Sequence, residues 1–237
     1  MPNKSFFNWS GGKDSAMALH RILQDPDYRI DSLFTSVNAK HQRISMHGVR
    51  EELLDLQAVN LKIPLQKIYL SEHPSMEEYN QKMEEKILQF KNEGYSHSVF
   101  GDIFLEDLKK YREEKLAQHG MIAAFPIWKR NTKELLEEFL ALGFKTILVC
   151  VDAKLLEQSF AGRIIDEQFI NDLPENVDPC GENGEFHTFV FDGPIFEKPI
   201  PIQKGEVVYR EYPAPNTDSN ESKKMGFWFC DLIPNVN

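Results

Sequence analysis

The segment SGGKDS at residues 10–15 lies between a short apolar run, Ser5–Trp9, and a helical pattern over Asp14–Gln24. It is therefore expected to form a turn from a strand into a helix, where the first backbone N–H groups lack intrahelical partners and the helix dipole is positive. Two glycines allow the backbone to approach an anion closely, because no Cβ intervenes. With two serine hydroxyls and one lysine alongside, the segment has the composition of a phosphate-binding loop.

Two common phosphate-binding motifs are absent from this position. A Walker A loop requires G-x-x-x-x-G-K-[ST] and a dinucleotide-binding fold requires G-x-G-x-x-G, and neither spacing occurs at residues 10–15. An ordinary strand–helix turn, in which the glycines only permit the bend, is the alternative interpretation. The serines and the lysine around the glycines favour phosphate binding over that alternative.

The first half of the chain alternates strand and helix patterns. Expected strands are Ser5–Trp9, Ser32–Asn38, Gln66–Leu70 and His97–Ile103, and expected helices are Asp14–Gln24, Val49–Leu61, Ser75–Glu93 and Glu106–His119. This alternation is typical of an α/β fold with an open parallel sheet covered by helices on both faces. Such sheets bind ligands at the carboxyl ends of their strands, where the SGGKDS segment is expected to lie.

The pattern changes in the second half, which is expected to form a smaller α+β domain. Expected helices are Asn131–Leu142 and Gly162–Asp172, and expected strands are Phe144–Val151, His187–Asp192, Glu206–Tyr212 and Met225–Leu232. The last two strands are expected to pair with each other across a polar loop at Pro213–Lys224. The boundary is placed between residues 128 and 129, which gives domains 1–128 and 129–237.

The composition of the chain limits which partners it can bind and in which compartment it is expected. The 237 residues include 27 Lys and Arg against 37 Asp and Glu, a formal net charge of −10, which excludes a basic footprint for duplex DNA. The densest apolar run, Thr146–Val151, is far shorter than the roughly 20 residues of a membrane-spanning helix, and Met1–Ser10 lacks the pattern of a signal peptide. Three isolated cysteines predict neither disulfides nor a zinc site, so a cytoplasmic protein is expected.

Together with motifs further along the chain, the SGGKDS segment resembles the signature of the PP-loop ATP pyrophosphatases, which have a Rossmann-like, adenine nucleotide alpha hydrolase-like fold. Over roughly residues 5–200 the chain also resembles the diphthine–ammonia ligase family. The motifs that carry this second resemblance are Gly101-Asp102-Ile103, Asp107, Arg112, Glu114, Pro126-Ile127-Trp128, Cys180-Gly181-Glu182-Asn183-Gly184-Glu185, Thr188 and Asp192.

The resemblance implies an ATP-dependent amide ligase. ATP would adenylate a carboxylate of a modified histidine on translation elongation factor 2, pyrophosphate would leave, and ammonia would displace AMP. The residues that would hold the pyrophosphate end of ATP are Ser10, Gly11, Gly12, Lys13, Asp14 and Ser15. Mg²⁺ is expected with the phosphates, and Asp14 and Asp102 are its candidate ligands, although a helix start and a strand end explain these two acids equally well.

The family also implies positions for the rest of the nucleotide. Gly101 would stand beside the phosphates, and Val37 and Asn38, at the end of the second strand, would read adenine through backbone groups. Arg50 would contact a phosphate or the substrate carboxylate, and a surface arginine at a helix start is the equal alternative.

An acidic turn, Gly181-Glu182-Asn183-Gly184-Glu185, is the most informative segment outside the loop. A structural turn needs glycine but does not need paired acids. We hypothesise that Glu182 and Glu185 bind ammonium or the modified-histidine substrate, and that one of them accepts the proton released on attack. Cys180 is interpreted as a packing residue, since amide ligation needs no thiol.

The chain departs from the family pattern around the expected acceptor site. The departures are Asn183, Phe186, His187 and Leu108-Lys109-Lys110. ATP chemistry is therefore better supported than the identity of the acceptor, and another carboxylate is the alternative substrate. Two other functions are weighed: a PP-loop enzyme that modifies RNA, disfavoured by the acidic charge balance, and a module that binds ATP without cleaving it. The oligomeric state is left open, a homodimer included.

Overall fold

The computed structural model describes residues 1–44, 48–213 and 224–235. His47 and all but the two ends of the polar loop expected at Pro213–Lys224 lie outside the described residues. Within the described ranges, no helix is both long enough and apolar enough to cross a membrane.

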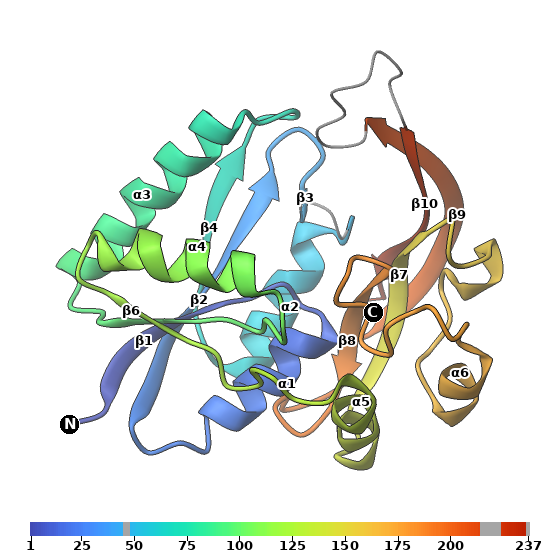
Figure 1. The fold of residues 1–237 in the computed structure, drawn as a ribbon, viewed down its shortest axis with the longest axis horizontal. Coiled ribbons are helices and arrows are strands. Elements are labelled where there is room, and N and C mark those ends of the chain that lie inside the picture. Colours follow the sequence, from blue (N-terminus) through green and yellow to red (C-terminus); the bar gives the residue numbers. More distant parts are fainter. Residues whose placement is uncertain (45–47, 214–223, 236–237) are drawn as a thin grey trace.

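The first sheet is open and mostly parallel, as the alternating pattern predicts (Figure 1). Its parallel strands run in the order β4-β2-β1-β5-β6, and β3 adds a short antiparallel pairing at the end of β2. The strands are β1 (Asn3–Asn8), β2 (Tyr28–Asn38), β3 (Arg43–Ile44), β4 (Leu65–Leu70), β5 (His97–Val99) and β6 (Ile122–Ala124).

Helices cover both faces of this sheet, and each face has its own apolar core. The helices are α1 (Lys13–Ile22), α2 (Glu51–Leu61), α3 (Met76–Asn92) and α4 (Glu106–Ala117). Under α3 and α4, Phe6 of β1 stacks on Phe90 of α3 with ring centres 4.0 Å apart. The core on the other face includes Met17 of α1 and Leu53 of α2 and continues into the second half of the chain.

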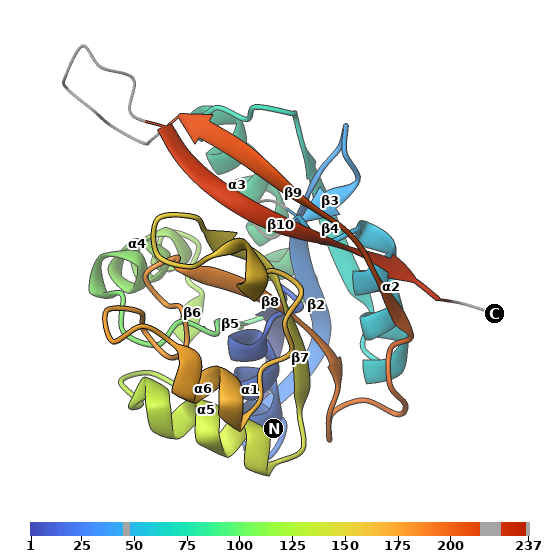
Figure 2. The same cartoon turned by 90° about the vertical axis from the view of Figure 1, so that its right-hand side faces the viewer.

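The second sheet is antiparallel, with strand order β8-β7-β10-β9. Its strands are β7 (Lys145–Asp152), β8 (Phe186–Asp192), β9 (Ile202–Pro213) and β10 (Lys224–Pro234), accompanied by α5 (Thr132–Ala141), η1 (Gln158–Phe160) and α6 (Glu167–Asp172). The expected pairing of the last two strands is confirmed, since β9 and β10 form a long antiparallel ribbon (Figure 2). The α/β fold with a smaller α+β part is therefore as expected.

Two expected elements end earlier or begin later than predicted. The helix expected over Gly162–Asp172 begins only at Glu167. Gly162 adopts a φ of 80°, and Ile164 forms an isolated bridge with Ile147 of β7, so this stretch lies along the sheet instead of coiling. The strand expected over His97–Ile103 ends at Val99, because its partner β6 has only three residues.

The two sheets are connected by the α1–α2 face of the first. α1 contacts β8 and α2 contacts β10, so these two helices lie between the sheets. The carboxyl end of β1 and the start of α1 therefore lie next to β8 (Figure 1). This packing decides what surrounds the SGGKDS segment.

Candidate functional site

The SGGKDS segment forms the turn between β1 and α1, as predicted. Gly11 has a φ of 78°, a left-handed conformation that favours glycine, and its carbonyl accepts hydrogen bonds from Val190 N (2.9 Å) and Gln57 Nε2 (3.1 Å). Gly12 is the N-cap of α1 and offers no side chain to the amides of the first turn. The turn therefore presents the N-terminus of a ten-residue helix, which favours anions.

β8 packs directly against this turn. The Lys13 amide donates to Thr188 Oγ1 at 3.0 Å, and a Cβ on Gly12 would lie 3.1 Å from the Thr188 carbonyl oxygen. The hydroxyls of Ser10 and Ser15 are hydrogen-bonded at 3.1 Å. Glycine at position 12 therefore permits the close approach of the second sheet to the loop.

Lys13 is buried, and its ammonium is surrounded by groups from both halves of the chain. Its Nζ lies 2.8 Å from Asp14 Oδ2, donates to the Cys180 carbonyl, and lies 5.2 Å from the centre of the Phe186 ring. Burial alone would lower the pKa of Lys13, but the surrounding acidic groups, with Asp14 contributing most, together outweigh burial and the pKa is raised. Lys13 is therefore held in its charged form beside the loop, paired with the Asp14 carboxylate.

Gly101 and Asp102 lie against the start of α1. A Cβ on Gly101 would lie 3.0 Å from both Asp14 C and Ser15 N, so any side chain there would crowd the backbone at the start of α1. Asp102 Oδ1 accepts from Arg112 Nη2 at 3.1 Å, whereas Oδ2 is buried and has no hydrogen-bond partner among the described residues. A buried carboxylate oxygen without a partner is a suitable ligand for a hard cation such as Mg²⁺.

No cluster of three or more metal-ligating side chains occurs in the part of the chain that the structure describes. Mg²⁺ bound to a nucleotide needs only one or two carboxylates, because phosphates and water supply the remaining ligands. Asp102 fits that requirement. Asp14 places both oxygens within 2.9 Å of Lys13 Nζ, so its role as a ligand stays a prediction.

Glu182 of the acidic turn reaches across to the first half of the chain. Its Oε1 accepts from the Ile103 amide at 2.8 Å. Burial raises the pKa of Glu182 to about 7, with the charge of Asp14 as a smaller contribution in the same direction. A carboxylate that titrates near neutral pH is suited to accept or donate a proton under physiological conditions.

Glu185 is buried and directed into its own turn. It accepts hydrogen bonds from Asp178 N (3.1 Å), Asn183 N (2.9 Å) and Asn183 Nδ2 (2.9 Å). Asp178 holds the same turn by accepting from Cys180 N and Glu182 N. These bonds give Glu185 a structural task, and its contact with ammonium or substrate stays a prediction.

Burial shifts the pKa of two further side chains near the acidic turn, Cys180 and His187. Burial raises the pKa of the Cys180 thiol, which donates to the Thr132 carbonyl at 3.3 Å, and this agrees with a packing role. Burial lowers the pKa of His187 to about 4, so the imidazole is neutral where the family pattern has an acid.

The residues expected to read adenine and the remaining anion are engaged by other parts of the chain. Val37 and Asn38 are flanked by β3 on one edge and β4 on the other, and Asn38 Nδ2 donates to the Glu72 carbonyl at 3.1 Å. Arg50 forms a two-pronged ion pair with Asp231 of β10, at 2.7 and 3.2 Å. Their roles in binding ATP stay predictions.

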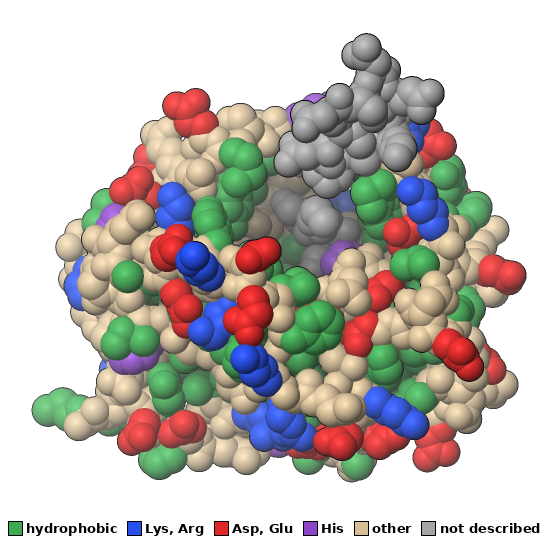
Figure 3. All heavy atoms as spheres, in the orientation of Figure 1, with side chains coloured by type: hydrophobic (Ala, Val, Ile, Leu, Met, Phe, Trp, Pro, Cys, Tyr) green, Lys and Arg blue, Asp and Glu red, His purple; other side chains and the backbone are tan. Residues whose placement is uncertain are grey.

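The surface is hollowed between the α3 side of the molecule and the β9–β10 side (Figure 3). Figure 3 also shows acidic and basic side chains gathered together over α4. The arrowheads of β2 and β4 lie side by side and point toward the region of β3 (Figure 1).

Sequence reasoning missed the polar groups that fix the loop from behind. Gln57 is fully buried in α2, accepts from Trp9 Nε1 (2.9 Å), and donates to the Gly11 and Val190 carbonyls. A glutamine in a helical pattern carries no signal of this role. Thr188 was visible only through the family motif, and its bond to the Lys13 amide depends on how the two sheets pack.

Comparison with protein families gives two matches. The model described as "Diphthamide synthase N-terminal domain" matches residues 3–122, and the model described as "Diphthamide synthase C-terminal domain" matches residues 131–214.

Curated relatives agree with the family matches. A protein named diphthine–ammonia ligase from Bos taurus is 31% identical over 110 residues, 44% of this chain and 41% of the relative. The protein of that name from Homo sapiens is 30% identical over 116 residues, 46% of this chain and 43% of the relative. The one from Danio rerio is 31% identical over 124 residues, 50% of this chain and 49% of the relative. The matched part of this chain thus spans about half or less of each relative.

The first family match alone covers half of the chain, and the second lies within the other half. Both agree with the motifs at residues 10–15, 101–103 and 180–185, which the fold brings to one place. The chain therefore belongs to the diphthamide synthase family, the diphthine–ammonia ligase group of the PP-loop superfamily.

Proposed function

We propose that this protein is an ATP-dependent, AMP-forming amide ligase that joins ammonia to a substrate carboxylate. The observation that carries this proposal is the convergence of Lys13, at the start of α1, with the acidic turn that holds Glu182. A cationic phosphate-binding loop and a proton acceptor near neutral pH are the two parts that such a reaction needs. The family to which the chain belongs supports the same assignment.

In this proposal the loop residues 10–15 bind the β- and γ-phosphates of ATP. Adenylation breaks the bond between the α- and β-phosphates, so negative charge develops on the leaving pyrophosphate. Lys13 and the amides at the start of α1 are proposed to stabilise that charge, after the Lys13 amide exchanges Thr188 Oγ1 for a phosphate oxygen. Gly101 and Gly12 leave room for the loop to hold this shape.

Mg²⁺, when bound, would neutralise part of the phosphate charge. Asp102 is the residue proposed to hold it through its unpartnered Oδ2, with Asp14 as the second candidate. Arg112 holds Asp102 through the other oxygen, so this carboxylate is fixed in direction before any ligand arrives.

In the second step ammonia attacks the acyl adenylate, the new C–N bond forms, and AMP leaves with the electrons of the broken C–O bond. The attacking nitrogen loses a proton, and Glu182 is proposed to accept it. Glu185 is proposed to act with Glu182 in binding ammonium, and residues 129–237 are proposed to carry most of the acceptor site. Val37 and Asn38 are proposed to contact adenine, and Arg50 an anion.

The acceptor proposed is diphthine, the substrate in the relatives' printed name. As the resemblance implies, we propose that it is the modified histidine of translation elongation factor 2. Three free, buried cysteines fit the proposed location in a reducing cytoplasm. A homodimer is proposed as the state to test first by light scattering.

The test is product identification with Mg²⁺-ATP, ammonium and a set of carboxylate acceptors. AMP and pyrophosphate are expected, whereas ADP would indicate a different reaction, and intact ATP with tight binding would favour a non-catalytic module. Lys13→Ala is expected to reduce pyrophosphate release by about 100-fold or more. Lys62→Ala is the matched control, because that lysine is 69% exposed and pairs with Glu197 at the end of α2.

A further inference from the structure

A buried amide of α2 lies behind the loop at residues 10–15, where α2, β8 and the loop meet. The Gln57 side chain is fully buried, and its Nε2 donates to the carbonyls of Gly11 (3.1 Å) and Val190 (2.6 Å). Its Oε1 accepts from Trp9 Nε1 at 2.9 Å. An indole N–H can only donate and a carbonyl can only accept, so this network permits one orientation of the amide.

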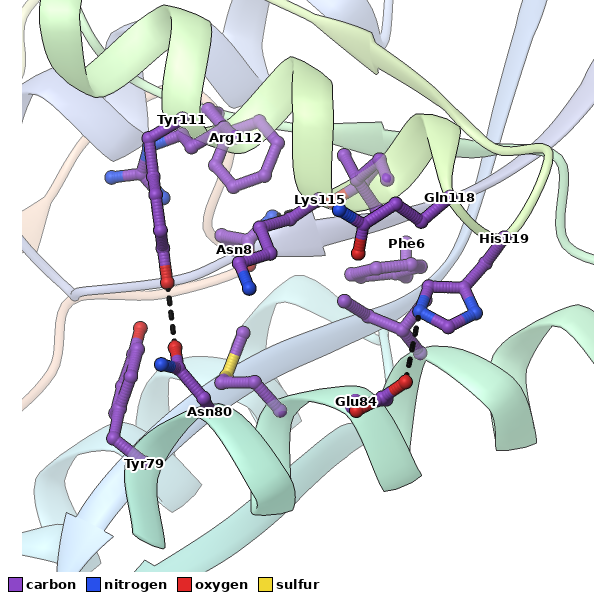
Figure 4. Close-up of a pocket in the computed structure, with 15 residues that line it drawn as sticks. Phe6, Asn8, Tyr79, Asn80, Glu84, Tyr111, Arg112, Lys115, Gln118 and His119 are labelled. Carbon is purple, nitrogen blue, oxygen red and sulfur yellow. Dashed lines mark hydrogen bonds and ion pairs between the residues drawn. The ribbon is translucent and has the colours of Figure 1, made fainter. Parts of the chain in front are cut away.

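The end of β1 is fixed on both faces of the first sheet. Asn8 lies between α3 and α4 (Figure 4), and its Nδ2 donates to Ser98 Oγ at 2.8 Å and to the Val99 carbonyl at 2.9 Å. On the opposite face, Trp9 is buried in the core that includes α1 and α2, and it is bonded to Gln57. The conformational freedom of the turn is therefore greatest at the two glycines that follow.

The peptide unit between Gly11 and Gly12 rotates easily, because neither residue has a Cβ. In a trans peptide the Gly11 carbonyl and the Gly12 N–H point in opposite directions, so a rotation exchanges them. In the structure the carbonyl faces Gln57 and Val190 N, and the Gly12 amide donates to Ser10 Oγ at 3.3 Å. A rotated unit would present a carbonyl oxygen to an anion where an N–H group is needed.

Gln57 strengthens the contact between β8 and this peptide unit. β8 stands at the end of the strand order of the second sheet, and Val190 N donates to the Gly11 carbonyl at 2.9 Å. Gln57 binds that same Gly11 carbonyl and the Val190 carbonyl, so the three residues form a closed ring of hydrogen bonds. Loss of the amide would leave Val190 O and Trp9 Nε1 buried without these partners and would leave Gly11 with one donor.

We propose that Gln57 is a positioning residue of the phosphate site, which holds the Gly11–Gly12 peptide unit with its N–H group toward the phosphates. This inference rests on the proposed binding of the β- and γ-phosphates of ATP by residues 10–15. Gln57 acts through the backbone, since its side chain is buried behind the loop. Its substitution should therefore weaken the binding of these two phosphates and spare the rest of the nucleotide.

Gln57→Met tests this role, because methionine has a similar length and lacks the two N–H donors. Isothermal titration calorimetry on the full chain compares α,β-methylene-ATP with AMP, which lacks the two phosphates assigned to the loop. The variant is expected to lose about tenfold or more in affinity for the analogue, and to keep its affinity for AMP within about twofold. A residue that only supports the fold would change both affinities alike.

Asn60→Leu is the matched control. Asn60 is another buried amide of α2, and its Nδ2 donates to the Leu56 carbonyl of the same helix at 2.9 Å. This variant is expected to change the melting temperature and to leave the ratio of the two affinities unchanged. If that ratio fell equally in Asn60→Leu and Gln57→Met, the effect would belong to α2 as a whole and the proposal would be wrong.

Gln57→Glu separates positioning from packing through pH. A protonated carboxyl accepts from Trp9 Nε1 and donates one hydrogen bond to a carbonyl, whereas a carboxylate donates none. Relative to the parent at the same pH, the affinity of this variant for the analogue is expected to fall about tenfold or more between pH 6 and pH 9, and that of Gln57→Met to stay constant. None of the hydrogen-bond partners of Gln57 titrates, and Lys13, Asp14 and Glu182 are present in all three proteins.

The parent protein distinguishes this inference from the proposed function. If the parent binds the analogue no more tightly than AMP, residues 10–15 do not bind the two phosphates and both proposals fail. If the parent prefers the analogue and both Gln57 variants keep that preference at every pH, only the role of Gln57 is overturned. Thermal unfolding checks that each variant is folded, and if Gln57→Met does not fold, the pH dependence of Gln57→Glu decides.

Discussion

Glu182 makes the stability of the site depend on pH near neutrality. Its pKa is raised by burial to about 7, against 4.5 for an unburied glutamate. Between these values the folded state keeps a proton that the unfolded state has released, so the free energy of unfolding falls as pH rises from about 4.5 to about 7. Glu182→Gln keeps the acceptor for Ile103 N and cannot ionise. We expect the variant to match the parent at pH 4.5 and to exceed its unfolding free energy by about 1–2 kcal/mol at pH 8.

Urea denaturation at several pH values measures this difference, and Glu185→Gln is the control. Glu185 accepts three hydrogen bonds inside its turn, so its substitution is expected to lower stability by a similar amount at pH 6 and pH 8. If the free energy of unfolding of Glu182→Gln also ran parallel to that of the parent from pH 4.5 to pH 8, Glu182 would be ionised throughout this range. In turnover assays, the rate of the parent should rise with pH near 7 as Glu182 ionises, and Glu182→Gln should lack this rise.

Gly101 tests whether the end of β5 shapes the loop. An added Cβ would lie 3.0 Å from backbone atoms of Asp14 and Ser15, and backbone cannot move aside as a flexible side chain can. Gly101→Ala is expected to cost about 1–3 kcal/mol of stability and to weaken ATP binding. Gly205→Ala, crowded at 3.2 Å by Asp231 Cβ and far along the chain, is expected to lower stability alone. Equal ATP affinity in both variants would separate Gly101 from the nucleotide site.

The contact between β8 and the start of α1 leads to a prediction about competition. The Lys13 amide donates to Thr188 Oγ1, and the same amide is expected to bind phosphate. Thr188→Val leaves that amide without an acceptor, which costs about 1–2 kcal/mol of stability when no nucleotide is bound. A phosphate would then meet no competing acceptor, so ATP should bind several-fold more tightly.

Calorimetric titration and urea denaturation measure both effects, and Thr188→Ser should keep the parental values because its hydroxyl remains. Weaker ATP binding by Thr188→Val would show that Thr188 assists the nucleotide instead of competing with it.

Long, strongly patterned elements could be predicted from the sequence. The helix at Met76–Asn92 has a capping serine, Ser75, whose hydroxyl accepts from Glu78 N as the spacing indicates. β3 and β6 were missed because two or three residues carry no detectable period. The stretch beginning at Gly162 was misassigned because its bridge to β7 is a long-range contact that local propensity does not contain.

The candidate site divides in the same way. The loop at residues 10–15 could be predicted because its function depends on local backbone and composition. The contacts of Lys13 with Cys180 and of Glu182 with Ile103 join residues more than 75 positions apart, and only the fold brings them together. The ion pair of Arg50 with Asp231 is another such contact, and the sequence could not indicate it.

The two sheets are held together by the larger of the two apolar cores, which runs from the α1–α2 face of the first sheet into the second sheet. The family match at residues 131–214 covers β7, β8 and β9 but not β10 of the second sheet, and the boundary at residue 128 stays a prediction. A core shared in this way favours a single cooperative unfolding transition.

Asp231 tests the polar part of this attachment. It accepts from Arg43 Nη1 at 2.8 Å and from Arg50 Nη2 at 2.7 Å, so a carboxylate of β10 holds two arginines of the first half. Burial alone would raise the pKa of Asp231, but the two guanidinium groups outweigh it and the pKa is lowered. Its contribution is therefore present above the unfolded value of 3.8 and is lost as pH falls through the folded pKa.

Asp231→Asn is expected to lower the unfolding free energy at pH 7 by about 1–2 kcal/mol, because both arginines lose their charged acceptor while still half-buried. The difference from the parent should shrink below pH 3.8, where the parental carboxyl also becomes neutral. Asp31→Asn, which breaks a pair within a single strand with the exposed Arg29, should leave stability nearly unchanged. A loss at pH 7 that persisted undiminished at pH 3 would assign the effect to packing and not to the ion pairs that connect β10 to the first half.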